Sequence, residues 1–221
     1  MSWYGSLLGI PAPGSTVSTF SSHYFGPGSA LGAALIGVSI GAYTGYRGGW
    51  WDSIFLRISE IVMSFPQIIL VLLLVSILGQ SLMNLIIIFT LTGWGSLYRM
   101  TRAQMLSLRE EEYVQALKAF GLSRARICFK HILPNALGPI MVNITLSTAM
   151  FILQEAGLSF LGLGVPLNIP TWGNILNVAQ DLRILQNYWW VWLPSGITIS
   201  LFVLAINFVG DGLRDSTDPT L

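Results

Sequence analysis

Long stretches without a single charged residue dominate this chain. The hydrocarbon core of a bilayer is about 30 Å thick, and a helix needs about 20 apolar residues to cross it. Soluble helices of such length would alternate polar and apolar faces, which these stretches do not do. We therefore predict an all-α fold, a polytopic bundle of membrane helices. Its five predicted spans cover residues 28–46, 61–79, 82–98, 132–154 and 188–210.

The composition agrees with a membrane protein and excludes several classes of function. Only 10% of the 221 residues are charged, whereas a soluble domain carries about 25%. The net charge of +1 gives no indication of a nucleic-acid partner. Cys128 is the single cysteine, so an internal disulfide and a cysteine-based metal cluster are excluded. We predict neither catalytic residues nor a metal site in this chain.

The basic residues indicate which loops face the cytoplasm. Seven of the eleven Lys and Arg lie in residues 99–130, between the third and fourth predicted spans. Cytoplasmic loops are enriched in Lys and Arg, so this loop is predicted to lie inside. With five spans, the uncharged residues 1–27 then form an external N-terminal tail.

A further uncharged stretch, residues 156–180, is predicted to lie outside and is called the outer segment here. Its continuous apolar run covers 12 residues, 156–167. That length suits a re-entrant or interfacial segment better than a sixth span. We interpret Glu155 and Asp181, which flank the segment, as solvated charges.

Within the spans, glycines and prolines predict local features of the helices. Gly37, Gly41 and Gly45 recur every fourth residue, a spacing that lets helix backbones approach closely. Pro66, Pro139 and Pro194 are each expected to bend a span. The predicted spans contain no charged residue, although ion-coupled carriers usually keep ionisable groups there. This argues against a self-contained secondary transporter or channel, which remains the alternative.

The cytoplasmic loop, residues 107–131, contains the pattern of two short helices. Apolar residues at helical spacing predict an amphipathic helix over 110–120; they are Tyr113, Ala116, Leu117 and Phe120. Gly121 occupies the position of a left-handed C-cap. Ser123 is a candidate N-cap for a second helix, which Pro134 is expected to end. A compact pair of helices with an apolar stripe would fit a groove on a partner protein.

This loop resembles the EAA loop of permease subunits in binding-protein-dependent ABC importers. The motif's opening triplet corresponds to residues 115–117, its glycine to Gly121 and its Leu-Pro pair to residues 133 and 134. Three positions depart from the family pattern: Gln115 replaces Glu, Leu117 replaces the second Ala, and His131 replaces Ile.

Motifs outside the loop resemble the dipeptide, oligopeptide and nickel branch, most of all its second permease. They are the sequence LSFLGLG at 158–164, PTWGN at 170–174 and GYRGGW at 45–50, followed by Asp52. The resemblance covers about residues 28–221. Members of the family usually have six spans, so we expect either a true start upstream or a shortened copy.

The resemblance implies a permease subunit in a prokaryotic cell (inner) membrane. It would form the path for peptides, or for nickel or other small solutes, delivered by an external binding protein. Its other partners would be a homologous sister permease and two ATPase subunits, which bind ATP and Mg. The assignment of ATP binding to other subunits agrees with the lack of a Gly-x-x-x-x-Gly-Lys-[Ser/Thr] phosphate loop in this sequence. We predict no cofactor in this chain. A membrane-embedded enzyme or a structural scaffold is less consistent with these features.

Two sets of residues are the candidate functional sites that follow from the loop pattern and the resemblance. The predicted ATPase-coupling set comprises Glu112, Tyr113, Gln115, Ala116, Leu117, Phe120, Gly121, His131, Leu133 and Pro134. The predicted external gate comprises Leu158, Gly162, Gly164, Trp172 and Gly173.

Overall fold

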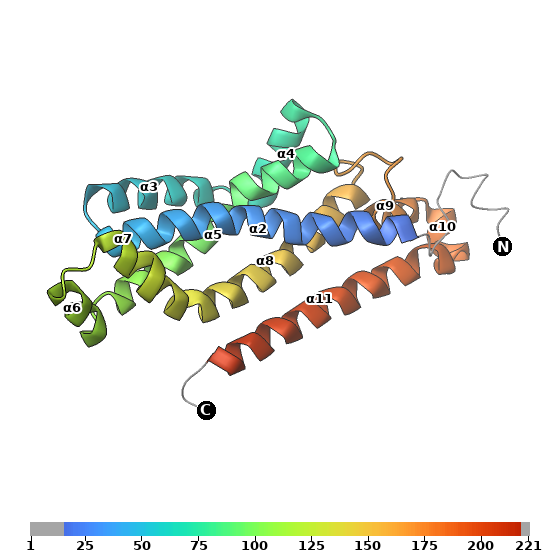
Figure 1. Ribbon diagram of the computed structural model, residues 1–221. Helices are drawn as coiled ribbons and strands as arrows, with labels where there is room; N and C mark the ends of the chain where they lie inside the picture. Colours follow the sequence, from blue (N-terminus) through green and yellow to red (C-terminus); the bar gives the residue numbers. More distant parts are fainter. Residues whose placement is uncertain (1–15, 218–221) are drawn as a thin grey trace.

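A computed structural model describes the backbone of residues 16–217 and the side chains of residues 24–216. Within these ranges all regular elements are helices, which confirms the predicted all-α class. In chain order they are α2 (Thr16–Arg47), α3 (Trp50–Ser64), α4 (Gln67–Leu78), α5 (Leu82–Leu108), α6 (Glu112–Ala119), α7 (Arg124–Arg126), the π-helical turn η1 (Ile127–Ile132), α8 (Leu133–Phe160), α9 (Trp172–Asn177), the 3-10 turn η2 (Val178–Gln180), α10 (Leu182–Asn187) and α11 (Trp189–Thr217). The long helices form an elongated bundle, with α6 and α7 at one end and α9 and α10 at the other (Figure 1).

The helix pair α2 and α5 forms the centre of the bundle, with the glycine face of α2 against α5. A Cβ on Gly37 would lie 2.6 Å from the carbonyl oxygen of Trp94, and one on Gly41 would lie 2.7 Å from that of Tyr98. A Cβ on Gly45 would lie 3.1 Å from the Cα of Arg102. The backbones approach this closely because the glycines have no side chains.

The first predicted span is part of a longer helix, because α2 already begins at Thr16. Residues 16–27 were predicted to belong to the external tail, and residues 1–15 lie outside the described part of the chain. Tertiary packing explains the extension: Phe25 is fully buried, and its ring meets that of Phe89 edge to face at 5.1 Å. Pro27 lies inside this helix.

The second predicted span, residues 61–79, is divided at Pro66 into two helices. The chain forms α3 and α4, which meet at an angle of 85° (Figure 1). Pro66 lacks a backbone N–H, and proline disfavours helical backbone in the residue before it. Phe65 accordingly adopts an extended conformation, with φ −95° and ψ 138°. The sequence predicted a bend here, but the proline divides the segment into two helices.

The predicted end of the second loop helix at Pro134 is also wrong, because α7, η1 and α8 run on as one helical segment over 124–160. The backbone N–H of Leu133 donates to the carbonyl of Cys128, five residues earlier. This wider π-helical turn lies directly before Pro134, and the helix continues through it although the proline has no N–H to donate. The loop therefore contains one separate helix, α6, and the first turns of a long helix.

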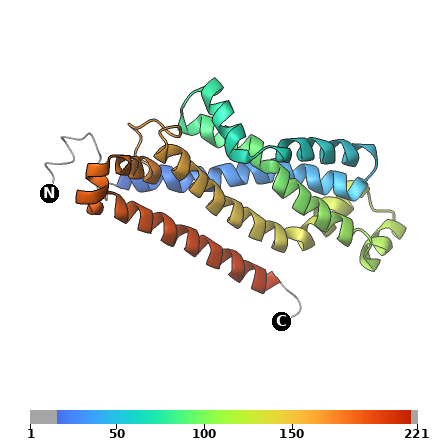
Figure 2. The same ribbon diagram turned by 180° about the vertical axis from the view of Figure 1, so that it is seen from behind.

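The last helix, α11, runs along α8 and packs against α9 (Figure 2). Ile152, Trp172 and Ile199 are the centre of a small apolar cluster between these helices. By length and composition, three segments of the described chain can cross a membrane, or four if α3 and α4 count as one broken span. The topology with five spans stays a prediction.

Candidate functional site

The end of α6 is fixed by a Schellman motif centred on Gly121. The N–H of Leu122 donates to the carbonyl of Leu117 at 3.3 Å, and the N–H of Gly121 donates to that of Lys118 at 3.0 Å. Gly121 has φ 75°, a left-handed conformation that glycine adopts without a steric penalty. Ser123 precedes α7 as its N-cap residue, but its side chain makes no capping hydrogen bond.

The helix α6 has an inner and an outer face. Val114 is fully buried and Leu117 half-buried, and both pack with Ile127 and Ile132 under the loop. Tyr113, Ala116 and Phe120 point to the surface and form the exposed α6 face, where 81% of Phe120 is accessible. The predicted apolar stripe therefore does not lie on one face: Leu117 belongs to the inner face and the other three residues to the outer face.

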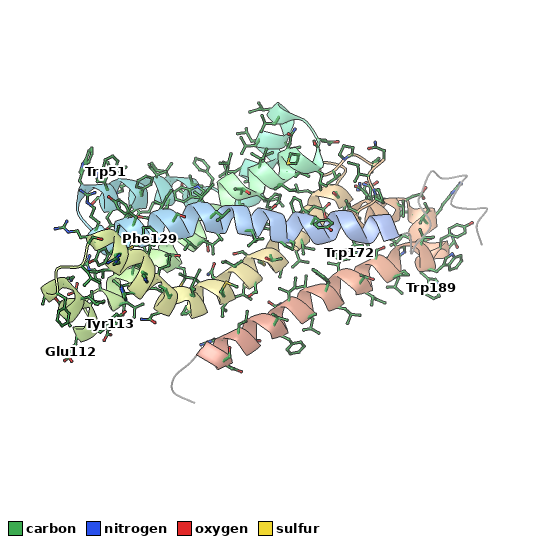
Figure 3. All side chains as sticks on the ribbon, in the orientation of Figure 1. Trp51, Glu112, Tyr113, Phe129, Trp172 and Trp189 are labelled. Carbon is green, nitrogen blue, oxygen red and sulfur yellow. The ribbon has the colours of Figure 1, made fainter. Side chains whose placement is uncertain are left out.

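The other residues of the predicted coupling set lie around the exposed α6 face. Glu112 begins α6, where a negative charge favours the helix dipole (Figure 3). The hydroxyl of Tyr113 accepts a hydrogen bond of 3.2 Å from Asn135 on α8. Gln115 and Pro134 are exposed, whereas His131 and Leu133 are half-buried.

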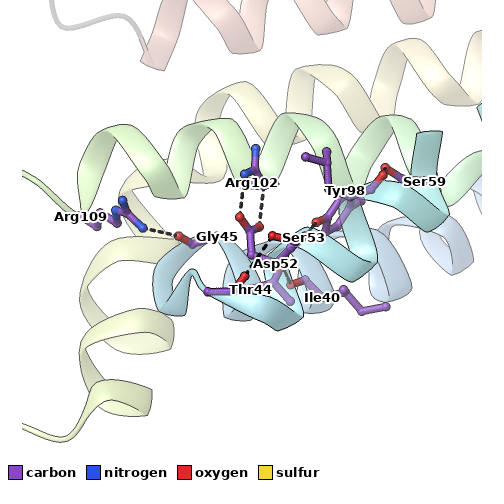
Figure 4. A network of polar contacts seen from close by, with 11 residues as sticks. Ile40, Thr44, Gly45, Asp52, Ser53, Ser59, Tyr98, Arg102 and Arg109 are labelled. Atoms are coloured by element: carbon purple, nitrogen blue, oxygen red, sulfur yellow. Dashed lines mark hydrogen bonds and ion pairs between the residues drawn. The ribbon is translucent and has the colours of Figure 1, made fainter.

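An ion pair between the buried Asp52 and the half-buried Arg102 connects two helices behind the loop. The carboxylate of Asp52 accepts two hydrogen bonds of 2.6 Å from the guanidinium of Arg102, which join α3 to α5 (Figure 4). The hydrogen bond from Asp52 raises the pKa of Arg102. Close by, Arg109 donates to the carbonyl of Gly45 at 3.3 Å. Sequence reasoning missed this network, although two opposite charges at the predicted inner ends of neighbouring helices were a possible signal.

The outer segment folds as a compact cap on the opposite end of the bundle. The side chain of Asn174 donates to the carbonyls of Val165, Pro166 and Ile169 at 2.8–3.3 Å. A Cβ on Gly164 would lie 2.6 Å from the backbone nitrogen of Ser159. The cap therefore packs tightly against the end of α8.

The residues predicted as an external gate all belong to this cap or its support. Leu158 and Trp172 are buried, and Trp172 lies at the α9 end of the molecule (Figure 3). A Cβ on Gly173 would lie 2.7 Å from the Cα of Ala156, and the carbonyl of Gly162 accepts a hydrogen bond of 3.0 Å from Gln80. The structure thus brings the five residues together at one end of the bundle.

Glu155 is not the solvated charge that the sequence predicted. Its side chain is 1% exposed, and its carboxylate accepts a hydrogen bond of 2.7 Å from the hydroxyl of Ser159. The outer segment, which was predicted to be re-entrant or interfacial, folds back over this carboxylate, and its position over Glu155 does not follow from the sequence.

A cavity of about 470 Å³ lies beside the break between α3 and α4, bounded also by α5 and α8. Its wall combines apolar residues such as Leu70 and Phe151 with polar, uncharged ones. The polar members are Gln67, Thr92, Ser96, Asn143, Ser147 and Gln154. A cluster of three or more His, Cys, Asp or Glu that could hold a metal is absent from the part of the chain that the structure describes.

Comparison with known protein families identifies the chain. The model of the "Binding-protein-dependent transport system inner membrane component" family matches residues 37–221. This chain is a member of that family. The membership agrees with the resemblance that the loop and outer-segment motifs predicted.

Several relatives of this inner membrane component carry names from peptide transport. A putative peptide permease protein of Brucella ovis is 44% identical over 191 residues, which cover 86% of this chain and 63% of that protein. The oligopeptide transport system permease protein OppC of Bacillus subtilis is 41% identical over 201 residues, covering 90% of this chain and 65% of that protein. The chain thus spans slightly less than two thirds of the length of these relatives.

The fold of this inner membrane component is also found in a solved transporter. Two crystal forms of the MetNI methionine ABC transporter, in inward-facing conformations, contain a chain that matches with TM-scores of 0.68 and 0.70. Each match covers 91% of this chain and 94% of the other, at 18% and 20% identity. At such identities the likeness shows the fold alone.

Proposed function

We propose that this chain is the transmembrane permease subunit of an ATP-driven importer. In the complex it forms a translocation path together with a homologous sister permease. Peptides are the proposed solute because relatives in the family are named as peptide permeases. The bacterial origin of these relatives supports a prokaryotic inner membrane as the location.

The observation that carries this proposal is the exposed α6 face at the end of the bundle opposite the outer segment (Figure 1). An apolar side chain such as Phe120, with 81% of its surface accessible at the end of a short rigid helix, suits a groove on a partner protein. We assign that groove to one of two ATPase subunits, which bind ATP and Mg.

Energy would enter the permease through this contact. Closure of the ATPase dimer on ATP would move α6, and the buried Val114 and Leu117 would transmit the movement to the start of the 124–160 helix. A partner shifts a conformational equilibrium only as far as it binds the two states differently, so the α6 contact has to differ between them. The bundle would then open alternately outward, toward a binding protein that delivers the solute, and inward.

Reconstitution tests this function directly. The chain, its sister permease, the two ATPases and the binding protein are placed in liposomes, and uptake of a radiolabelled tripeptide is measured with ATP on the ATPase side. We expect uptake that disappears when the phosphate-loop lysines of the ATPases are replaced. Uptake that continues without ATP and follows an imposed ion gradient would instead identify a secondary transporter.

A further inference from the structure

The cavity beside Pro66 has a composition that is unusual for a surface in contact with lipid. Asn143, Ser147 and Gln154 lie on α8 at spacings of four and seven residues, which place them on one face of the helix. Thr92 and Ser96 form a corresponding pair on α5. Polar side chains inside a membrane usually face the interior of the protein or a water-filled path.

Two amide side chains and one hydroxyl of this cavity form a chain of hydrogen bonds, and two acceptor oxygens of the lining have no partner. Gln154 donates to the side-chain oxygen of Gln67 at 3.4 Å, and Gln67 donates to the hydroxyl of Thr92 at 3.2 Å. The side-chain oxygens of Asn143 and Gln154 are buried and have no hydrogen-bond partner. A buried carbonyl oxygen without a donor is costly, and rotation of either side chain into the cavity would let the N–H group of a ligand supply the missing hydrogen bond.

The break between α3 and α4 also removes one helical hydrogen bond beside this wall. In an uninterrupted helix the carbonyl of Val62 would accept from the residue four positions later, but that residue is Pro66, which has no N–H. Val62 and Pro66 both line the cavity. Freed carbonyls at a helix break are tolerated where they face a cavity.

We propose that this cavity is a site in the translocation path that binds the backbone amides of a peptide rather than its side chains. The inference rests on the proposed function. The lining residues carry amides and hydroxyls but no charge, so the site can accept hydrogen bonds from N–H groups without preferring an acidic or a basic peptide. Every peptide carries the same backbone N–H groups, and a path that reads only these accepts peptides of many sequences.

The double variant Asn143→Leu/Gln154→Leu removes both unpartnered oxygens at nearly constant volume. Uptake into the reconstituted liposomes is measured for trialanine and for the analogue with N-methylated peptide bonds, each at saturating binding protein. We expect the double variant to lower the maximal rate for trialanine about tenfold, with less than a twofold change for the N-methylated analogue. Asn207→Leu, an amide on α11 that does not line the cavity, is the matched control and should leave both rates unchanged.

Three results would overturn the inference. One is an unchanged rate for trialanine in the double variant, and another is an equal fall for both peptides. The third is loss of the sister permease from the purified complex, because the polar face would then be a contact between permeases. If the wild-type complex imports neither peptide with ATP, the proposed function itself fails, and this outcome is distinct from the other three.

A second variant adds charge to the cavity with little change of shape. Gln154→Glu should raise the rate for trilysine relative to trialanine by about tenfold, because a carboxylate would attract the lysine side chains. An unchanged ratio in a complex that assembles normally would show that the solute does not pass this residue.

Discussion

Adding a single methyl group to the α2–α5 contact should destabilise the protein measurably. In Gly41→Ala the new Cβ would lie 2.7 Å from the carbonyl oxygen of Tyr98 and 3.0 Å from the Cβ of Thr101. An ordinary contact needs about 3.4 Å or more. The obstacle is backbone, so rotation of a side chain cannot relieve it and α5 has to move away. Overpacking of this kind costs about 1–3 kcal/mol.

Gly28→Ala is the matched control because it lies in the same helix with nothing within 4 Å of the added Cβ. Both substitutions gain about 1 kcal/mol of helix propensity. The difference between their free energies of unfolding therefore gives the cost of the steric contact alone. The free energy of unfolding is measured by SDS titration in mild detergent, followed by circular dichroism. We expect Gly41→Ala to be about 1–3 kcal/mol less stable than Gly28→Ala. Equal stabilities would refute the close packing of the two backbones.

Three other predictions address the ion pair, the outer segment and the topology. Asp52→Asn should destabilise the chain by about 2–3 kcal/mol because Arg102 loses its counter-charge, and an apolar pair at both positions should recover part of this loss in the same titration. Gly164→Val should abolish uptake in an assembled complex, because it displaces the outer segment from the end of α8. Normal uptake would show that this segment is only a linker. Cysteines introduced at Lys118 and Asn177 should react with impermeant reagents from the inner and the outer side, respectively, and labelling of both from one side would contradict five spans.

Features that depend on a few neighbouring residues were predictable from the sequence. Gly121 follows an amphipathic helix at the distance where a C-cap belongs, and its φ of 75° confirms the prediction. The glycines at 37, 41 and 45 marked one helix face by their spacing alone. In both cases the local backbone geometry admits few alternatives.

Features that depend on contacts between distant segments were not predictable. Asp52 and Arg102 are 50 residues apart in the chain, and only the packing of α3 against α5 brings them together. Glu155 was expected to be solvated, yet the fold of the outer segment covers it. Pro66 predicted a bend in the chain, but the angle of 85° between α3 and α4 also depends on the helices that pack against them. The cavity lining combines residues from helices far apart in sequence and was therefore not identified.

Ala116 and Gly121 are the two positions at which coupling of transport to ATP hydrolysis through the loop can be tested. Ala116→Arg places a charge in the proposed ATPase groove, where an unpaired charge is costly. A Cβ on Gly121 meets no atom within 4 Å, so Gly121→Val acts through its backbone conformation alone and tilts α6. Ala116→Ser and Gly121→Asn are the matched controls, since they add no charge and tolerate the left-handed conformation, respectively.

ATP-driven uptake by the four reconstituted complexes is the decisive measurement. We expect normal amounts of permease in all four and wild-type uptake in both controls. Ala116→Arg and Gly121→Val should show no uptake, with the ATPases detached or hydrolysing ATP without transport. Wild-type uptake in Ala116→Arg and Gly121→Val would show that this loop is not the coupling element.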